Sequence, residues 1–401
     1  MSLFLHVVPV SDAIAMVRRL AVRTEPEKVP VEDAFCRVLA DDVRADVDIP
    51  GFTRSVVDGY AVRATDTTGA GDAIPSMLTS SGRIAMGATT DRRVGAGECT
   101  YVPTGGILPD GADAVVMIEH TEMFGDNVLV RKPVAHGENV LFYNEDFAQG
   151  EIVLTAGKRL SAQDTGVLAA VGCVMVPVAR MPRIGIISTG NELVPVSEIP
   201  RAGQVRDVNT YVVSAYVRDH GCIPVVYGII HDDREPFRAA LTRAVAECDA
   251  VILSGGSSKD DRDMAAAIIA EQGEVLIHGV AIAPGKPTII GRCGTVPVIG
   301  LPGHPASAFI VLLVIGRHLL TGMTGETGTV PVMIPATLAL NVPSARGRED
   351  YVRVSLSDGI ATPLFGKSGL LNTLVKSNGV VRVPAESEGL ETGSTVEVIL
   401  W

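Results

Sequence analysis

From residue 183 onward, apolar runs and amphipathic stretches alternate along the chain. Short continuous apolar runs are typical of strands buried on both faces of a sheet, as in RIGIIS (183–188), PVVYGII (224–230) and DAVILS (249–254). Between them lie segments with apolar residues at helical spacing, such as REPFRAALTRAVAE (234–247). This alternation predicts an α/β domain in which helices cover both faces of a parallel sheet.

Three segments rich in Gly, Ser or Pro each follow directly on a predicted strand. They are STGNE (188–192), SGGSS (254–258) and LPGHP (301–305). Because ligands of parallel sheets bind beyond the carboxyl ends of the strands, we expect the three segments to share one edge and to form a binding site there. Backbone N–H groups left free in such turns hold anions, although each turn alone also fits an ordinary strand–helix connection.

The chain on either side of this domain has a different pattern. Residues 11–23, 31–42 and 161–173 have helical spacing, whereas residues 65–160 and 331–401 contain short β-branched runs separated by turns. We therefore expect a multidomain chain of α/β plus β class. Its parts are a split helical domain (1–46 with 148–178), an inserted β-rich domain (47–147), the parallel α/β domain (179–328) and a small C-terminal β domain (329–401).

Composition narrows the function and the location. The 401 residues are 47% hydrophobic and 20% charged, as in a well-buried globular protein. A net charge of −12 argues against a nucleic-acid surface, so an anionic ligand needs local basic residues or a metal. The six cysteines form no C-x-x-C pair, and the longest apolar run (308–316) is shorter than a membrane span. We expect a soluble cytoplasmic protein that binds neither membrane nor nucleic acid.

Candidate binding residues gather at the predicted sheet edge, and each also has a structural interpretation. Ser188, Thr189 and Gly190 suit a phosphate and Glu192 a metal or a ligand N–H, but a capped turn explains them equally well. Capping also explains Asp207 and Asn209, and Lys286 is either an oxyanion ligand or a solvated surface lysine. The other candidates at this edge are Ser254, Gly255, Gly256, Ser257, Gly285, Pro302, Gly303, His304, Pro305 and Ser307.

Four further candidates lie beyond these turns. Asp58 follows SVV in SVVDGYA (55–61), Thr104 begins TGG and Asp146 ends NED, all in the β-rich part, where Asp and Gly also make ordinary turns. Asp263 follows SGGSS by five residues. Acids beside an anion site would repel the ligand, and a divalent cation between them would remove that conflict.

Taken in order, these motifs resemble the molybdopterin molybdenumtransferase family (MoeA-type), to which the C-terminal domain of gephyrin also belongs. The resemblance covers nearly the whole chain. It is carried by PGFTRSVVDGYAVRA, PTGGILPDGADAVVMIE, NEDF, ISTGNELV, GQVRDVN, SGGSS, APGKP and GLPGHPAS. It implies a homodimer whose active site lies between the α/β domain of one subunit and the β domain of the other.

The implied reaction is the last step of molybdenum cofactor synthesis: molybdate (or tungstate) enters adenylylated molybdopterin, and AMP leaves with the help of Mg²⁺. A molybdopterin adenylyltransferase is the implied donor, and a molybdoenzyme or chaperone the acceptor. The resemblance implies catalytic roles for Asp58, Thr104, Asp146, Glu192, Asp263 and Lys286, with Asp58, Glu192 and Asp263 as Mg²⁺ ligands. A catalytically reduced molybdopterin-binding scaffold and a phosphohydrolase acting on another nucleotide-linked substrate are the alternatives.

This sequence departs from the family pattern at four places. Val57 stands where Met is usual, and His304 replaces the asparagine of LPGNP. Ala283 stands where many members carry a basic residue, and Lys259-Asp260-Asp261 replaces a glycine-containing turn. The last two departures lead to the hypothesis that Lys259 supplies the positive charge that Ala283 lacks.

Overall fold

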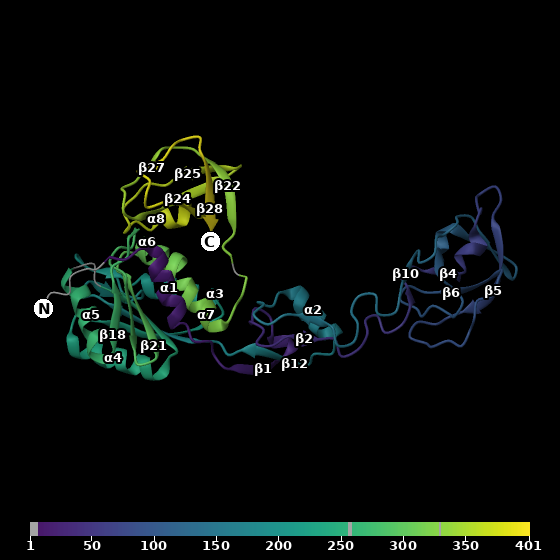
Figure 1. The fold of residues 1–401 in the computed structure, drawn as a ribbon, viewed down its shortest axis with the longest axis horizontal. Coiled ribbons are helices and arrows are strands. Elements are labelled where there is room, and N and C mark those ends of the chain that lie inside the picture. Colours follow the sequence, from purple (N-terminus) through teal and green to yellow (C-terminus); the bar gives the residue numbers. More distant parts are fainter. Residues whose placement is uncertain (1–6, 256–258, 329) are drawn as a thin grey trace.

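The computed structural model describes residues 7–255, 259–328 and 330–401, and for residues 259–263 the backbone alone. The molecule is elongated (Figure 1): the α/β domain lies at one end beside the C-terminal domain, a small middle domain follows, and a distal β domain lies at the other end. The chain leaves the α/β domain after its first helix, reaches the distal domain and returns to the α/β domain.

The α/β domain is built on a six-stranded sheet in the order β16-β13-β17-β21-β20-β18. Its strands are β13 (Arg183–Thr189), β16 (Ile223–Ile230), β17 (Ala250–Gly255), β18 (Glu274–His278), β20 (Ile289–Cys293) and β21 (Val296–Pro302). The first four strands in the sheet order are parallel, as predicted. The prediction of a parallel sheet is wrong for β20 alone: it runs antiparallel to both of its neighbours, β21 and β18, because only two residues, Gly294 and Thr295, join it to β21.

Helices cover both faces of this sheet, and alternate strand residues point to opposite sides. Ile184, Ile186 and Ile252 pack in a core shared with helices on one face, and Ile187 and Leu253 pack in a second core on the other face. The helices of the first face are α1 (Val10–Leu20), α3 (Asn209–Asp219), α6 (Pro305–Val311) and α7 (Arg317–Thr324). The second face is covered by α4 (Arg234–Glu247) and α5 (Lys259–Gln272).

The segment from α6 to α7 is one continuous helix, joined through a π-helical turn at Leu312–Gly316. Among the described residues it is the one helix whose length and mean hydropathy (1.7 over its most apolar window) would allow a membrane crossing. It lies in the core of the α/β domain, and 72% of that window is buried. Its apolar composition is therefore accounted for by packing against the sheet.

The middle domain contains less helix than the sequence predicts. Its elements are β1 (Pro26–Pro30), β2 (Val43–Arg44), β11 (Ile152–Leu154), α2 (Ala162–Ala170) and β12 (Met175–Ala179). The α-helix expected over 31–42 is absent beyond a short 3-10 turn at Val31–Asp33, because Cys36 has a left-handed backbone with φ of 62° and Val38 and Leu39 form β-bridges to Arg159 and Val178. The assignment of residues 1–46 to this domain is also wrong for α1, whose Val10, Ala13 and Val17 lie in the α/β core.

The distal domain is a six-stranded β structure in the order β7-β4-β6-β5-β9-β8. Its strands are β4 (Gly59–Val62), β5 (Ser76–Arg83), β6 (Glu98–Val102), β7 (Ala114–Met117), β8 (Thr121–Phe124) and β9 (Asn127–Val130), with the short pair β3 (Arg54–Ser55) and β10 (Val140–Leu141). Two chain crossings connect this domain to the middle domain (Figure 1). Residues placed on its loops are therefore far from the α/β domain of the same chain.

The C-terminal domain is also a β structure, and it packs on the α/β domain. Its strands are β22 (Met333–Leu338), β23 (Val342–Pro343), β24 (Glu349–Ser357), β25 (Ile360–Pro363), β26 (Gly379–Val383), β27 (Gly389–Leu390) and β28 (Thr395–Leu400), with helix α8 (Asn372–Lys376). The strand β19 (Ile282–Ala283) of the α/β domain pairs with β24, and Tyr351 and Val380 enter the α/β core. The two domains therefore share an interface at the segment that leads to Lys286.

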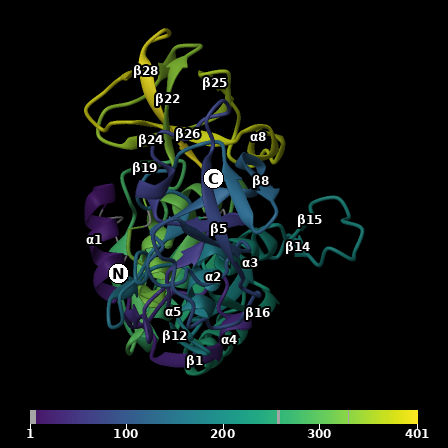
Figure 2. The ribbon, with the colours of Figure 1, turned by 90° about the vertical axis from the view of Figure 1, so that its right-hand side faces the viewer.

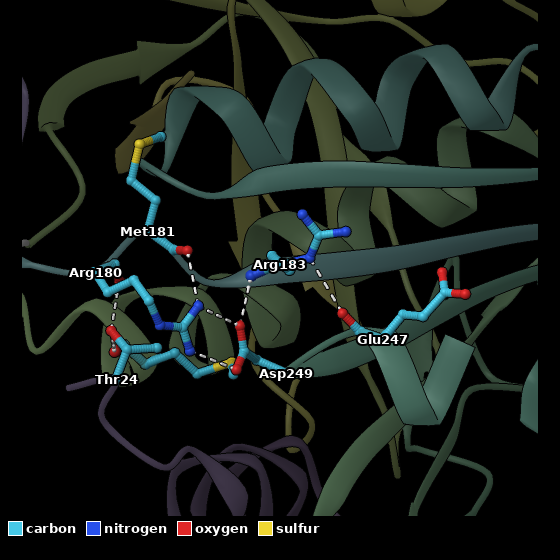
Figure 3. Close-up of polar contacts among 7 residues, drawn as sticks. Thr24, Arg180, Met181, Arg183, Glu247 and Asp249 are labelled. Atoms are coloured by element: carbon cyan, nitrogen blue, oxygen red, sulfur yellow. Dashed lines mark hydrogen bonds and ion pairs between the residues drawn. The ribbon is translucent and has the colours of Figure 1, made fainter. Parts of the chain in front are cut away.

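An ion pair between Arg180 and Asp249 stabilises the segment by which the chain re-enters the α/β domain (Figure 3). Arg180 Nη1 and Nη2 donate to the Asp249 carboxylate at 3.0 and 2.7 Å, and the Arg183 N–H donates to the same carboxylate at 2.7 Å. Thr24 Oγ1 donates to the Arg180 carbonyl at 2.5 Å, so both chain crossings meet here. Burial opposes ionisation of Asp249, but these hydrogen bonds outweigh it and lower the pKa of the carboxyl.

We predict that Asp249→Asn lowers the free energy of unfolding at pH 7 by roughly 1–2 kcal/mol, since charge-assisted hydrogen bonds are lost from a pair that is partly exposed. The pKa of Asp249 is lowered in the folded state, so its contribution is present above the unfolded pKa and is lost as pH falls through the folded pKa. Urea unfolding at pH 7 and pH 3 should show the gap between parent and variant closing in acid. Glu274→Gln, in an exposed pair with Arg292, is the control and should change stability by less; an equal gap at both pH values would contradict the assignment.

Candidate functional site

The three turn segments predicted to share a sheet edge do lie side by side. In the strand register Thr189 is opposite Gly255, and Gly255 is opposite Pro302. The backbones are close there, because a Cβ added to Gly255 would lie 1.6 Å from Thr189 Oγ1. Glycine at position 255 is therefore a requirement of the packing at this edge.

The first residues of α3 hold the ends of three strands together. Asn209 Nδ2 donates to Ser254 Oγ in β17 at 2.7 Å, and to the Gly303 carbonyl just after β21 at 2.8 Å. The hydroxyls of Ser188, at the end of β13, and Thr210 are 2.8 Å apart. Thr210 Oγ1 also donates to Asp207 Oδ2 at 2.6 Å. Asp207 Oδ1 also accepts from the Thr210 backbone N–H at 3.1 Å, so the carboxylate satisfies a free N–H at the start of α3 within a buried network.

One pocket opens over this network, with a volume of about 670 Å³. It is lined by predicted site residues of all three strand ends and of α3: Thr189, Glu192, Asp207, Asn209, Ser254, Gly255, Gly303, His304 and Pro305. Asn209 Oδ1 is buried and has no hydrogen-bond partner in the described part of the chain. The pocket therefore presents an amide oxygen and two carboxylates to a ligand.

A projecting segment forms one wall of this pocket. The short strands β14 (Leu193–Val194) and β15 (Val205–Arg206) pair at its base, and the residues between them extend away from the domain (Figure 2). Glu192 lies at this base, where its carbonyl accepts from the Val205 N–H at 2.8 Å. Gly190 lies beside it with φ of 155°, and its N–H donates to the Ile230 carbonyl.

A second pocket of about 540 Å³ lies between the α/β and C-terminal domains. Its lining includes the predicted residues Gly285, Lys286, Pro302, Gly303, His304 and Ser307. The C-terminal domain adds Arg346, Arg348 and Ser368, so three cationic side chains and no carboxylate line it among the described residues. Such a lining is suited to an oxyanion.

His304 stands between the two pockets, because it lines both. Its Nδ1 is 2.8 Å from Ser368 Oγ, and the Ala306 N–H donates to the Ser368 carbonyl at 3.1 Å. The replacement of asparagine by histidine at this motif thus keeps a polar side chain in contact with the C-terminal domain.

The sequence interpretation missed the residues of the C-terminal domain. Arg346 and Arg348 each have one acidic neighbour, Glu388 at 3.4 Å and Asp350 at 2.9 Å. They bring positive charge to the pocket that Ala283 also lines. The hypothesis that Lys259 supplies this charge stays untested, because its side chain lies outside the described residues. The signal in the sequence was the closely spaced pair of arginines in ARGRED (345–350).

The predicted residues of the β-rich part lie in the distal domain and its connection. Asp58 Oδ1 accepts from the Thr104 N–H at 2.7 Å and from Thr104 Oγ1 at 3.1 Å, and both residues are exposed. The TGG turn supports this contact, since Gly105 has φ of 79°. Asp146 is exposed and its N–H donates to the Ile49 carbonyl. One chain does not bring Asp58 to the pockets (Figure 1).

Some predicted residues lie outside the description: Gly256, Ser257 and the side chain of Asp263. Among the described residues, no group of three or more His, Cys, Asp and Glu side chains is placed to hold a metal. The predicted Mg²⁺ ligands Asp58 and Glu192 lie in different domains of one chain. A shared metal between these two acids therefore requires a second chain.

Three consecutive protein-family models match the chain. They are described as MoeA N-terminal region (domain I and II), residues 8–172; "Probable molybdopterin binding domain", residues 185–322; and MoeA C-terminal region (domain IV), residues 335–401. The molybdopterin molybdenumtransferase of Bacillus subtilis is 33% identical over 404 residues, which is 98% of this chain and 94% of that protein. The protein of the same name from Staphylococcus aureus (strain MRSA252) is 31% identical over 399 residues, 98% and 95% respectively.

Solved structures confirm the fold class. A molybdopterin biosynthesis MoeA protein from Pyrococcus horikoshii OT3 superposes with a TM-score of 0.86 at 34% identity, covering 98% of this chain and all of that one (100%). A second structure of a P. horikoshii MoeA protein gives a TM-score of 0.82 at 36% identity over 98% of this chain and 99% of that one.

We predict that Asn209→Ala weakens ligand binding in the 670 Å³ pocket at least tenfold, because Ser254 and the Gly303 carbonyl lose the group that sets their spacing. The cost in stability should be about 1–3 kcal/mol, as for other buried hydrogen bonds. Asn378→Ala is the matched control: Asn378 also makes two hydrogen bonds, both to Leu356 in the C-terminal domain. Equal losses of molybdopterin affinity in the two variants, measured by fluorescence titration, would sink the idea that Asn209 organises the pocket.

Proposed function

Because this chain belongs to the MoeA-type molybdopterin molybdenumtransferase family, we propose that it inserts molybdate into adenylylated molybdopterin and releases AMP, the last step of molybdenum cofactor synthesis. The observation that carries this proposal is a pair of adjoining pockets with different linings. They share Gly303 and His304; the first has Lys286, Arg346 and Arg348 and no carboxylate among its described lining residues, and the second has Glu192 and Asp207 together with Arg206. An oxyanion and an organic ligand with N–H groups would therefore lie side by side.

The cationic pocket is the proposed molybdate site. Lys286, Arg346 and Arg348 supply charge, and the buried Ser307 at the start of α6 supplies a hydroxyl. In a chain of net charge −12, such a local excess of cations is what attracts a dianion. Tungstate has the same tetrahedral shape and charge, so a tungstate-specific reaction is the variant of this proposal to test.

The 670 Å³ pocket is the proposed site of the pterin. A pterin presents N–H donors along one edge, and Glu192, Asp207 and Asn209 Oδ1 are acceptors. In the proposed reaction two Mo–S bonds form while oxygen leaves molybdate as water, and one water is consumed as the phosphoanhydride is cleaved and AMP leaves. The backbone turns at the strand ends would hold the phosphates through their N–H groups.

Magnesium fits the donor set of this pocket. Carboxylate and amide oxygens are the ligands it prefers, and Glu192 and Asn209 Oδ1 offer both. The ion, when bound, would neutralise the charge that develops on the phosphoanhydride. Asp263 remains a proposed further ligand.

A homodimer with its site between subunits follows from the same proposal. Asp58, Thr104 and Asp146 lie in or next to the distal domain, away from the pockets of their own chain (Figure 1). Across a two-fold axis, the distal domain of one subunit would reach the pockets of the other, where Thr104 would face the developing oxyanion.

We propose a molybdopterin adenylyltransferase as donor and a molybdoenzyme or its chaperone as acceptor. A cytoplasmic location is supported by the six cysteines, which are all free thiols.

The test is AMP release from adenylylated molybdopterin, with and without molybdate and Mg²⁺. Lys286→Ala should lower the rate about 10²–10³-fold, as the loss of one oxyanion ligand does elsewhere. Asp58→Asn should lower it similarly while leaving ligand affinity nearly unchanged. The controls are Lys376→Ala, in α8, and Asp126→Asn, on an exposed turn of the distal domain; both should keep the parent rate.

Other outcomes would separate the alternatives. Tight molybdopterin binding without AMP release would identify a scaffold. AMP release that does not depend on molybdate would identify a phosphohydrolase. AMP release that depends on tungstate and not on molybdate would identify a tungstate-specific paralogue.

A further inference from the structure

A third pocket lies between α1 and α7, in a part of the α/β domain that the proposed reaction does not use. Its volume is about 490 Å³. Arg317, in its lining, is twelve residues beyond Pro305, which at 1.5 Å per residue is about 18 Å along the helix from the sheet-edge pockets. A ligand bound here would be separate from the transferase site.

The side chains of this pocket leave two positive charges uncompensated. Arg18 and Arg317 line it, and neither forms an ion pair within the described residues. Arg317 is partly buried, and burial together with the charge of Arg18 lowers its pKa. The one acid among the described lining residues, Glu326, lies 3.8 Å from Arg159 Nη1, a cation outside the lining, and its buried Oε2 makes no hydrogen bond within the described residues. A partly buried cation without a counter-ion is unfavourable, and a bound anion would relieve the cost.

His318 adds a third donor, and its tautomer follows from its neighbour. Arg18 Nη2 is 3.3 Å from His318 Nδ1, and because a guanidinium only donates, Nδ1 is the acceptor and Nε2 carries the proton. Burial, followed by the charges of Arg317 and Arg18, lowers the pKa of His318 to about 4. At neutral pH the ring is therefore an uncharged N–H donor.

Thr321 does not compete for the ligand. Its Oγ1 donates to the Arg317 carbonyl at 2.9 Å, one turn earlier in the same helix, which leaves only its lone pairs free. The groups that remain available toward a ligand are the two guanidinium groups and His318 Nε2–H. Arginine forks match the oxygen spacing of phosphate, and the volume exceeds that of a simple inorganic ion.

We propose that the pocket formed by Arg18, Arg317 and His318 binds the phosphate group of a small phosphorylated molecule. Phosphate is favoured over a single carboxylate because it can accept from both arginines and the imidazole at once. Phosphate binding at this site does not depend on the proposed transferase reaction, which uses none of these three residues.

The experiment uses the intact protein with ¹⁵N-labelled histidine, and inorganic phosphate as the probe at constant ionic strength set with chloride. The ¹H–¹⁵N signals of His318, identified by their loss in His318→Gln, should shift and saturate with phosphate. The pKa of His318 should rise when phosphate binds, because a neighbouring anion favours the imidazolium. Glycerol phosphate should saturate the same signals at the same or a lower concentration.

Matched variants decide whether the response belongs to this pocket. Arg18→Ala should weaken phosphate binding at His318 at least tenfold, whereas Arg19→Ala, an exposed neighbour on the same helix, should not. Lys286→Ala, which disables the proposed molybdate pocket, should leave the His318 response intact. A His318 signal that does not respond to phosphate, or responds equally in Arg18→Ala, would overturn the site. A response lost in Lys286→Ala would show that it came from the transferase site.

Discussion

The side-chain network at the start of α3 is the constraint on which the binding site depends. Asn209 bonds to a side chain near the end of β17 and to the carbonyl of the residue that follows β21, and Thr210 joins the end of β13 to Asp207. The side chains of this network are buried, so a substitution leaves an unpaired polar group and also releases a strand end. The spacing of the three turns, and hence the shape of both adjoining pockets, is set by these few bonds and by the close packing at Gly255.

Positive charge is concentrated at one of the two adjoining pockets of an otherwise acidic chain. The chain is acidic overall, yet the pocket between the α/β and C-terminal domains has three cations and no carboxylate among its described lining residues. The pocket next to it has acceptors, and His304 contacts the C-terminal domain between the two. Asp58 and Thr104 form a separate, hydrogen-bonded pair at the far end of the molecule. The cationic pocket and the proposed acid therefore lie in different domains of one chain.

The local pattern of apolar and polar residues was enough to predict the alternating strands and helices of the α/β domain. The continuous apolar strands predicted the sheet, and the rule for parallel strands brought Thr189, Gly255 and Pro302 together. Contacts between distant segments were not predictable in this way. Arg346 and Arg348 reach the site through domain packing, and α1 leaves its sequence neighbours to enter the α/β core. Residues 31–42 form β-bridges to Arg159 and Val178 in place of the expected helix. Such pairings depend on tertiary context, which helical spacing in a single segment does not encode.

The central claim is that the two groups of site residues act together across two chains. Its most direct test is a heterodimer of Asp58→Asn and Lys286→Ala subunits, co-expressed with different tags and purified through both. In such a dimer one of the two sites combines an intact Lys286 with an intact Asp58, so AMP release should recover to about half of the parent rate. Both homodimeric variants should stay inactive. A heterodimer as inactive as the two homodimeric variants would contradict a site shared between subunits.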